Sequence, residues 1–154
     1  MRKIPRSPNV TAPPRLLIVD DNRMGVLARK TVLEESGYKV TATREPKDAL
    51  ELLAGGKFDL VITDYKMPGK SGGELVQRIR KIHPALPIVL ITGFADSLGL
   101  NEKNTGADLV IQKSSGEVSQ MIRGVSTLLR RAELARKKPP ASARPVGKAL
   151  RAKA

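Results

Sequence analysis

The sequence contains no cysteine and no tryptophan, and only two phenylalanines and two tyrosines among its 154 residues. Without cysteine the chain has no disulfides, no cysteine metal ligands and no cysteine nucleophile, which is compatible with the cytoplasm. With so few aromatic side chains, the core must be built from Val, Ile, Leu and Ala. The chain length is that of a single domain with a substantial core.

Long apolar runs are also absent, because none reaches the roughly 18–20 residues needed to cross a bilayer. The basic N-terminus meets Pro13 and Pro14 before any apolar stretch, so no signal peptide is predicted. We therefore expect a cytoplasmic protein without a membrane span. His83, the single histidine, precedes Pro84 in a predicted loop and is expected at the surface. No Ser-His-Asp set or glycine-rich phosphate loop is visible in the sequence, so neither a hydrolase nor a P-loop protein is indicated.

The net charge of +13 is concentrated at the two ends of the chain. Residues 1–15 hold four basic and no acidic residues, and residues 130–154 hold nine basic residues and one acidic residue. The part between them is close to neutral, so the total charge says little about its function. We expect a disordered, basic, Pro-rich arm at 1–14, a domain at 15–131, and a basic Ala/Lys/Arg/Pro-rich tail at 132–154, helical at its start and then disordered.

Between these ends, short apolar runs alternate with helical patterns. The predicted strands cover 16–19, 38–43, 60–63, 88–92 and 109–111. The predicted helices begin after residue 22 and cover 45–53, 74–82 and 117–131, with the last one free to continue to about Lys138. This alternation, with near-continuous apolar strands, predicts an α/β fold in which helices cover both faces of a parallel sheet.

Apolar spacing also predicts which helical side chains face the core. The predicted inward positions are Met24, Leu27, Val32 and Leu33 in the first helix, and Leu75, Ile79 and Ile82 in the third. Residues 93–106 carry Gly99, Asn101 and Asn104 and few apolar residues, so a short or mobile helix at best is expected there.

Polar residues follow four of the predicted strands where each strand ends: Asp20 and Asp21, Asp64, Thr92 and Lys113. In a parallel sheet these ends lie on one edge. Three clustered carboxylates repel one another, and a divalent cation such as Mg²⁺, which prefers oxygen ligands, relieves that repulsion. Lys113 offsets further charge, and Thr92 offers a donor to an oxyanion built on Asp64. The set suits phosphoryl transfer to Asp64.

These residues, together with Asp-Tyr-Lys-Met-Pro-Gly-Lys-Ser-Gly at 64–72, resemble the receiver domains of two-component response regulators. The resemblance covers most of the folded chain. It implies a flavodoxin-like, three-layer α/β/α fold whose five-stranded parallel sheet has the order 2-1-3-4-5. It also implies that Asp64 accepts a phosphoryl group from a sensor histidine kinase or a histidine phosphotransfer protein. Thr92 and Lys113 are then expected to bind the phosphoryl oxygens.

The resemblance further implies a magnesium site. Asp21, Asp64 and the backbone carbonyl of Lys66 are expected to hold Mg²⁺, with Asp20 acting mainly through water. A protein of this kind is a bacterial signalling phosphoprotein, and it is an enzyme only toward its own phosphorylation and dephosphorylation.

Three features depart from the family pattern. Val110 stands where an aromatic switch residue is usual, Ser114 follows the lysine in place of proline, and residues 93–106 form a weak fourth helix. The phosphorylation chemistry should survive these changes, whereas the output is expected to use a different rearrangement. The Thr-Gly-Phe run is similar to receivers of hybrid histidine kinases, and Phe94 is hypothesised to screen attacking water or replace the missing aromatic.

Other interpretations remain open at this point. Asp20 and Asp21 could be helix caps, Lys113 a solvated charge, and Thr92 an ordinary strand end. Our main hypothesis is a stand-alone receiver that binds an unknown downstream protein or shuttles phosphoryl groups. The alternative is a nucleic-acid- or scaffold-associated protein whose basic tails bind and whose receiver modulates. A third is a degenerate receiver used only for protein contacts, which the intact acidic set argues against.

Overall fold

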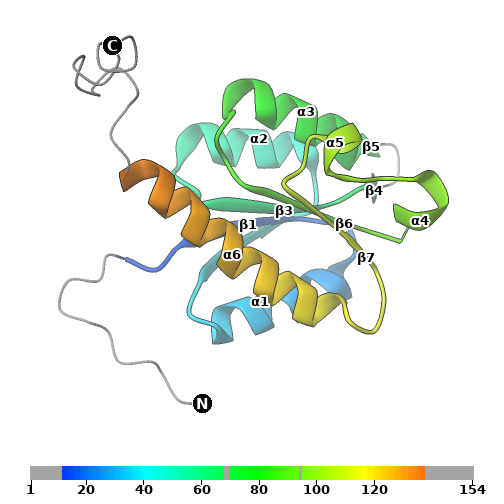
Figure 1. Ribbon diagram of the computed structural model, residues 1–154, viewed down its shortest axis with the longest axis horizontal. Helices are drawn as coiled ribbons and strands as arrows, with labels where there is room; N and C mark the ends of the chain where they lie inside the picture. The colour runs from blue at the N-terminus through cyan, green and yellow to red at the C-terminus, as the bar shows by residue number, and fades with distance from the viewer. Residues whose placement is uncertain (1–11, 68–69, 94, 138–154) are drawn as a thin grey trace, which may run out of the picture.

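One parallel β-sheet lies between two layers of helices in the computed structural model, which describes residues 12–67, 70–93 and 95–137 (Figure 1). The strands across the sheet are β2 (Lys39–Thr43), β1 (Arg15–Val19), β3 (Leu60–Asp64), β6 (Ile88–Thr92) and β7 (Leu109–Gln112). All neighbouring pairs are parallel. Numbered along the chain, these five strands have the order 2-1-3-4-5, which confirms the predicted fold class.

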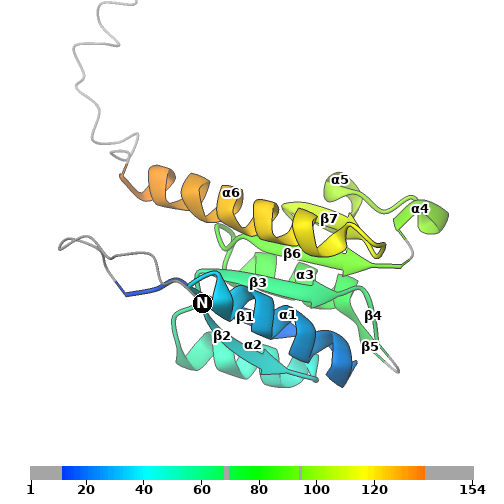
Figure 2. The same cartoon turned by 90° about the horizontal axis from the view of Figure 1, so that it is seen from below.

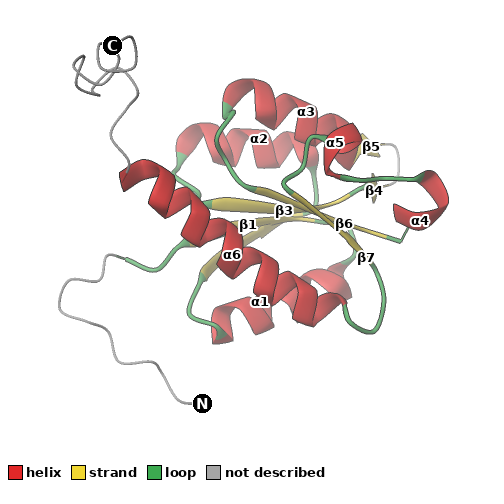
Figure 3. Cartoon of the chain, viewed as in Figure 1, coloured by secondary structure: helices red, strands yellow, loops and turns green. Residues whose placement is uncertain are grey.

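Four longer helices cover the two faces of the sheet. Helices α2 (Pro46–Gly55) and α3 (Gly72–Ile82) lie above the sheet in Figure 1, and α1 (Arg23–Glu35) and α6 (Glu117–Lys137) lie below it. Figure 2, seen from below, places α1 and α6 in front of the sheet. The colouring by secondary structure in Figure 3 shows the resulting helix–sheet–helix layering.

Alternate side chains of β1 build two separate cores. Leu16 and Ile18 pack in the cluster that includes α1 and α6, whereas Leu17 and Val19 pack in the cluster that includes α2 and α3. All four are fully buried. A strand covered on both faces is apolar throughout, which is why the sequence pattern of these strands does not alternate. Burying each such side chain contributes about 1.5–3 kcal/mol.

The predicted apolar face of the first helix is wrong in part. Met24 and Leu27 are 76% and 59% exposed, while Leu33 is buried as expected. The inward face of α1 instead carries Val26, Arg29 and Leu33, which follow one another at helical spacing. At 100° per residue Met24 lies opposite Leu33, so the two cannot share a buried face. A charged residue thus occupies a core-facing position that apolar spacing alone did not reveal.

The prediction that Ile82 faces the core is also wrong. Leu75 and Ile79 are buried as predicted, but Ile82 is 63% exposed at the last residue of α3. Helical spacing records the face on which a residue lies, and it does not record how far the neighbouring layer reaches along the helix.

The weak segment after β6 forms two single-turn helices, α4 (Ala95–Leu98) and α5 (Glu102–Thr105). Asn101 and Asn104 form a reciprocal capping box at the start of α5. Gly106 ends it in the left-handed region, with φ of +82°, a conformation that favours glycine. Local capping therefore shapes a stretch in which too few apolar residues exist to support a longer helix.

Side chains fasten this segment to the outer edge of β7. Glu102 Oε2 accepts a hydrogen bond of 2.8 Å from the backbone N–H of Val110. Gln112 Oε1 accepts one of 3.1 Å from the N–H of Asp96, and its Nε2 donates to the carbonyl of Gly93 at 3.0 Å. Polar contacts to the edge strand thus hold α4 and α5 in place. A longer helix would be held by packing of its apolar side chains.

A small hairpin that the sequence pattern did not predict follows β3. Strands β4 (Lys66–Met67) and β5 (Lys70–Ser71) pair antiparallel and return the chain to the end of β3. There the N–H of Gly72 donates to the carbonyl of Tyr65 at 2.6 Å. A Cβ added at Gly72 would lie only 1.8 Å from the backbone oxygen of Asp64. Glycine is therefore required where α3 begins against the strand end.

The C-terminal helix α6 extends to Lys137, as far as the sequence allowed. Phe94 and most of the two basic ends lie outside the described residues, so the expectations for them stay predictions. Among the residues that the structure describes, no helix has both the length and the apolar character needed to cross a membrane.

The clash at Gly72 gives a first prediction. We expect Gly72→Ala to lower the free energy of unfolding by at least about 1–3 kcal/mol, because backbone rather than a flexible side chain must move. Gly55→Ala is the matched control, since a Cβ there meets nothing within 4 Å, and it should leave stability unchanged or raise it by up to about 1 kcal/mol. Urea denaturation followed by circular dichroism measures both, and equal stabilities would contradict the expectation.

Candidate functional site

The five side chains predicted to form a site come together at the carboxyl edge of the main sheet. Asp20 and Asp21 directly follow β1, Asp64 is the last residue of β3, Thr92 ends β6 and Lys113 follows β7. The N–H of Lys113 donates to the carbonyl of Thr92 at 2.8 Å, which continues the strand pairing to the site. Parallel topology alone brings these residues, far apart in the sequence, to one edge.

The three carboxylates form a tight cluster. One oxygen from each of Asp20, Asp21 and Asp64 lies within 4.8 Å of the others. Asp20 and Asp64 are only 1% and 7% exposed, so water cannot screen their repulsion well. Oxygen donors grouped in this way suit a hard divalent cation such as Mg²⁺. Lys66, whose carbonyl is expected as a further ligand, begins β4 two residues after Asp64.

Asp64 is held by a donor on each oxygen. Its Oδ1 accepts a hydrogen bond of 2.8 Å from the N–H of Tyr65, and its Oδ2 accepts one of 3.1 Å from Lys113 Nζ. Burial raises the pKa of Asp64, and the charge of Asp20 adds to this effect. Lys113 and the Tyr65 N–H lower it without cancelling the rise. The carboxylate is thus fixed in position and costly to leave ionised without a further cation.

The local structure argues against two of the simpler interpretations. The N-cap of α1 is Asn22, whose side chain accepts a hydrogen bond of 3.1 Å from the N–H of Gly25. Asp20 and Asp21 therefore do not cap that helix. Lys113 is two-thirds buried and ion-paired with Asp64, so it is not a freely solvated charge.

Arg29 is a site residue that reasoning from the sequence missed. Its side chain enters from α1, is 9% exposed, and pairs with Asp20 through Nη1 and Oδ2 at 2.5 Å. Its Nη2 lies 3.4 Å from Oε2 of Glu117, the first residue of α6. The available signal was an arginine four residues before Leu33, on the apolar face of a predicted helix.

The family model of the response regulator receiver domain matches residues 16–123. The chain is a member of the response regulator receiver family. Receivers are signalling domains of two-component systems, and the acidic cluster described here fits the Mg²⁺ that such domains bind.

Similar sequences form parts of larger proteins. The chain is 35% identical over 122 residues to Protein PetR of Rhodobacter capsulatus, an alignment that covers 78% of the chain and 50% of PetR. It is 39% identical over 87 residues to sensor histidine kinase GacS of Pseudomonas protegens, covering 53% of the chain and 10% of GacS. The chain thus spans about half the length of PetR and a small part of GacS.

Solved receivers share the fold. Response regulator TrrA of Thermotoga maritima, in complex with Mg(2+)-BeF, superposes with a TM-score of 0.68 at 31% identity, covering 75% of the chain and 98% of TrrA. A CheY-like receiver of Methanospirillum hungatei superposes with a TM-score of 0.72 at 28% identity, covering 80% of the chain and 98% of that protein.

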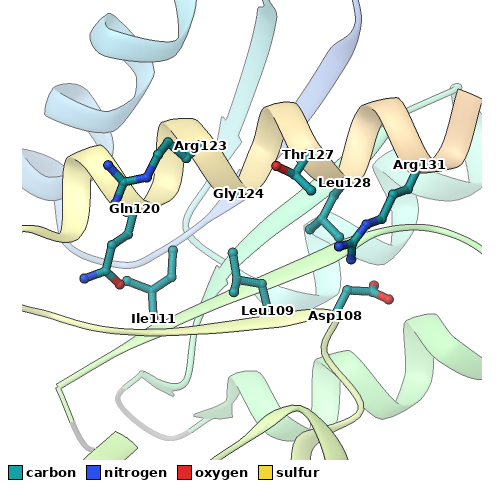
Figure 4. A pocket seen from close by; sticks show the side chains of 9 residues that line it. All are labelled: Asp108, Leu109, Ile111, Gln120, Arg123, Gly124, Thr127, Leu128 and Arg131. Carbon is teal, nitrogen blue, oxygen red and sulfur yellow. The ribbon is translucent and has the colours of Figure 1, made fainter.

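A groove of about 450 Å³ lies between β7 and α6 of the receiver, and it does not include the cluster of Asp20, Asp21 and Asp64 (Figure 4). Leu109 and Ile111 line its floor, and Arg123 and Arg131 of α6 reach toward it. None of the six predicted site residues lines this groove. The acidic site is therefore distinguished by its charge, and this groove lies elsewhere.

The raised pKa of Asp64 gives a prediction on stability. A raised pKa means that the folded state binds the proton more tightly than the unfolded chain. Stability of the metal-free protein should therefore fall as pH rises from the ordinary carboxyl pKa, 3.8, through the higher folded value. Accordingly, Asp64→Asn should be more stable than the native chain at pH 7 in EDTA, and this advantage should vanish below the ordinary pKa.

Thermal melts across pH, followed by circular dichroism, measure this difference. Asp48→Asn, at an exposed acid in the first turn of α2, serves as control and should show no such pH-dependent gain. A metal-free Asp64→Asn protein less stable than the native chain at pH 7 would show that the pair with Lys113 outweighs burial.

Proposed function

We propose that this receiver accepts a phosphoryl group on Asp64 in a Mg²⁺-dependent reaction and signals through the phosphorylated state. The observation that carries the proposal is the Asp64 carboxylate, fixed between the Tyr65 N–H and Lys113 Nζ inside a cluster of acids. The family match supports the same chemistry.

The proposed reaction transfers phosphorus from nitrogen to oxygen. The N–P bond of a donor phosphohistidine breaks, an O–P bond forms at one oxygen of Asp64, and the bonding electrons leave with the imidazole. Mg²⁺, when bound by Asp21, Asp64 and the Lys66 carbonyl, supplies charge neutralisation for the phosphoryl oxygens. Lys113, whose ammonium already lies 3.1 Å from Asp64 Oδ2, would bind a phosphoryl oxygen, and Thr92 would donate to another.

We propose a sensor histidine kinase or a histidine phosphotransfer protein as the donor. Similarity to a segment of GacS, which is itself named a sensor histidine kinase, supports this class of partner. The phosphorylated receiver would then bind a downstream protein or pass the phosphoryl group to another histidine. It would act catalytically only on its own phosphorylation and dephosphorylation.

The test is incubation of the full chain with Mg²⁺ and acetyl phosphate, followed by intact mass spectrometry. We expect one phosphoryl adduct that hydroxylamine removes, because an aspartyl phosphate is an acyl phosphate. Asp64→Asn should lose the adduct completely, and EDTA should suppress it. The exposed Asp48→Asn control should be labelled like the native chain.

Beryllofluoride, the phosphoryl analogue bound with Mg²⁺ in TrrA, provides a second readout. We expect Mg²⁺-dependent NMR shifts around Asp64 in the native chain and none in Asp64→Asn. An adduct of equal size on Asp64→Asn would sink the proposal.

A second candidate is nucleic-acid or scaffold binding through the basic end of the chain. The end of α6 favours it, because Arg130, Arg131, Arg136 and Lys137 are all exposed there. These side chains lead into five further basic residues and no acid at 138–154. In this alternative the receiver modulates the binding of its tails.

Truncation separates the two candidates. If the tails bind DNA, affinity should fall steeply with salt and be lost when residues 138–154 are removed, while phosphorylation of Asp64 is retained. Fluorescence anisotropy with a labelled duplex at several salt concentrations measures this. No binding at low salt, or binding that survives truncation, would rule out the tail-driven function.

A further inference from the structure

An arginine of helix α1, Arg29, reaches into the acidic site. It pairs with Asp20, whereas Lys113, which follows β7, pairs with Asp64. Arg29 is 7% exposed, although it belongs to a helix whose outer face is available to solvent. An arginine guanidinium is a cation whose planar, forked donors suit carboxylates. A buried charge of this kind must be paired, and both of its partners are carboxylates.

Each oxygen of its first partner, Asp20, already accepts a hydrogen bond from the protein itself. Asp20 Oδ2 accepts from Arg29 Nη1 at 2.5 Å, and Asp20 Oδ1 accepts from the N–H of Asn22 at 3.0 Å. The same carboxylate belongs to the acid cluster. A cation bound by this cluster must therefore share Asp20 with a positive charge that is already in contact with it.

Its second partner is on another helix. Arg29 Nη2 lies 3.4 Å from Glu117 Oε2, on the residue that begins α6. Helices α1 and α6 lie side by side on one face of the sheet (Figures 1 and 2). One guanidinium thus bridges the acidic site and the start of the helix that leads to the basic end of the chain.

We propose that Arg29 is a resident cation of the acidic site, which competes with Mg²⁺ for Asp20 and couples metal binding to Glu117 at the start of α6. This inference rests on the proposed function, since it takes Mg²⁺ as the ligand of the acids. When Mg²⁺ offsets the charge of Asp20, the attraction between Arg29 and Asp20 weakens and Glu117 becomes its stronger partner. Arg29 thereby lowers the affinity for Mg²⁺ and protects the metal-free site from repulsion.

The test measures the Mg²⁺ dissociation constant of the full, unphosphorylated chain by NMR titration, without any phosphodonor. Arg29→Met keeps the bulk of the side chain and removes the charge. We expect it to tighten Mg²⁺ binding by about three- to tenfold, because a positive charge near a divalent ion at a poorly hydrated site is repulsive. The metal-free protein should melt at a lower temperature than the native chain, and Mg²⁺ should raise its Tm by more.

Arg23→Met is the matched control, because Arg23 is an exposed arginine on the same helix. Solvent and salt screen its charge, so we expect a change in Mg²⁺ affinity of less than about twofold. An Arg29→Met protein that binds Mg²⁺ no more tightly than the native chain, or more weakly, would overturn the proposal. A merely structural arginine would lower the Tm without tightening metal binding.

Glu117→Gln tests the coupling. In the native background it should weaken Mg²⁺ binding, because Arg29 then interacts with Asp20 alone. In the Arg29→Met background the same change should alter the affinity by less than about twofold. Mg²⁺ should also shift the amide resonances of Glu117 and Val118 in the native chain and not in Arg29→Met. Equal effects of Glu117→Gln in both backgrounds would show that no coupling exists.

Arg29→Lys provides the test should Arg29→Met fail to fold. A single ammonium keeps the charge but lacks the fork that reaches both carboxylates. We expect Mg²⁺ to bind no more tightly than in the native chain, and the Glu117→Gln effect to be lost. An undiminished Glu117→Gln effect would show that Arg29 does not bridge Asp20 and Glu117. Failure of the native chain to bind Mg²⁺ would instead reject the proposed function. The native chain should bind Mg²⁺ and be labelled at Asp64. If it does so and the Arg29→Met protein has the same Mg²⁺ affinity, this inference alone is rejected.

Discussion

Repulsion among three carboxylates at one edge of the sheet is the constraint on which the rest of the site depends. Two of these groups, Asp20 and Asp64, are almost completely buried, so the protein must supply cations close to them. It does so from two directions, with Lys113 beyond β7 and Arg29 on α1. Each cation holds one acid in place. Two cations do not neutralise three carboxylates, so negative charge remains to attract a divalent ion. The carboxylates therefore repel one another, while the two ion pairs hold them in fixed positions.

The two sides of the site are connected to the rest of the receiver by different forces. Arg29 and Glu117 join the acids to α6 through a pair of charges. On the side of β7, Glu102 and the Gln112 side chain hold α4 and α5 to the edge strand by hydrogen bonds. Val110 packs against the core next to this edge. Polar contacts of this kind can exchange partners at modest free-energy cost, whereas a packed core resists such change.

The acidic site was predictable because it requires only strand ends and parallel topology. Asp64 and Thr92 close apolar runs, and any parallel sheet brings such ends to one edge, whatever the side chains between them do. Side-chain burial on single helices was harder to predict. Met24 and Leu27 are apolar and exposed, and Arg29 is charged and buried, because the face that α1 presents is decided by the sheet and by α6. The structure shows that the predicted site residues meet, whereas the roles proposed toward metal and phosphate stay predictions for all six: Asp20, Asp21, Asp64, Lys66, Thr92 and Lys113.

By itself the sequence determined the alternation of strands and helices, the order of the acids, and the resemblance that names the family. Those properties are local, since apolar runs, caps and strand-ending residues are read from neighbours along the chain. Only the tertiary structure decided that Arg29 is part of the site. Its partner Glu117 lies 88 residues away, and no periodicity in either helix records that the two meet. The physical reason is that pairing of charges depends on distance in space, which is set by how α1 and α6 pack on the same face of the sheet.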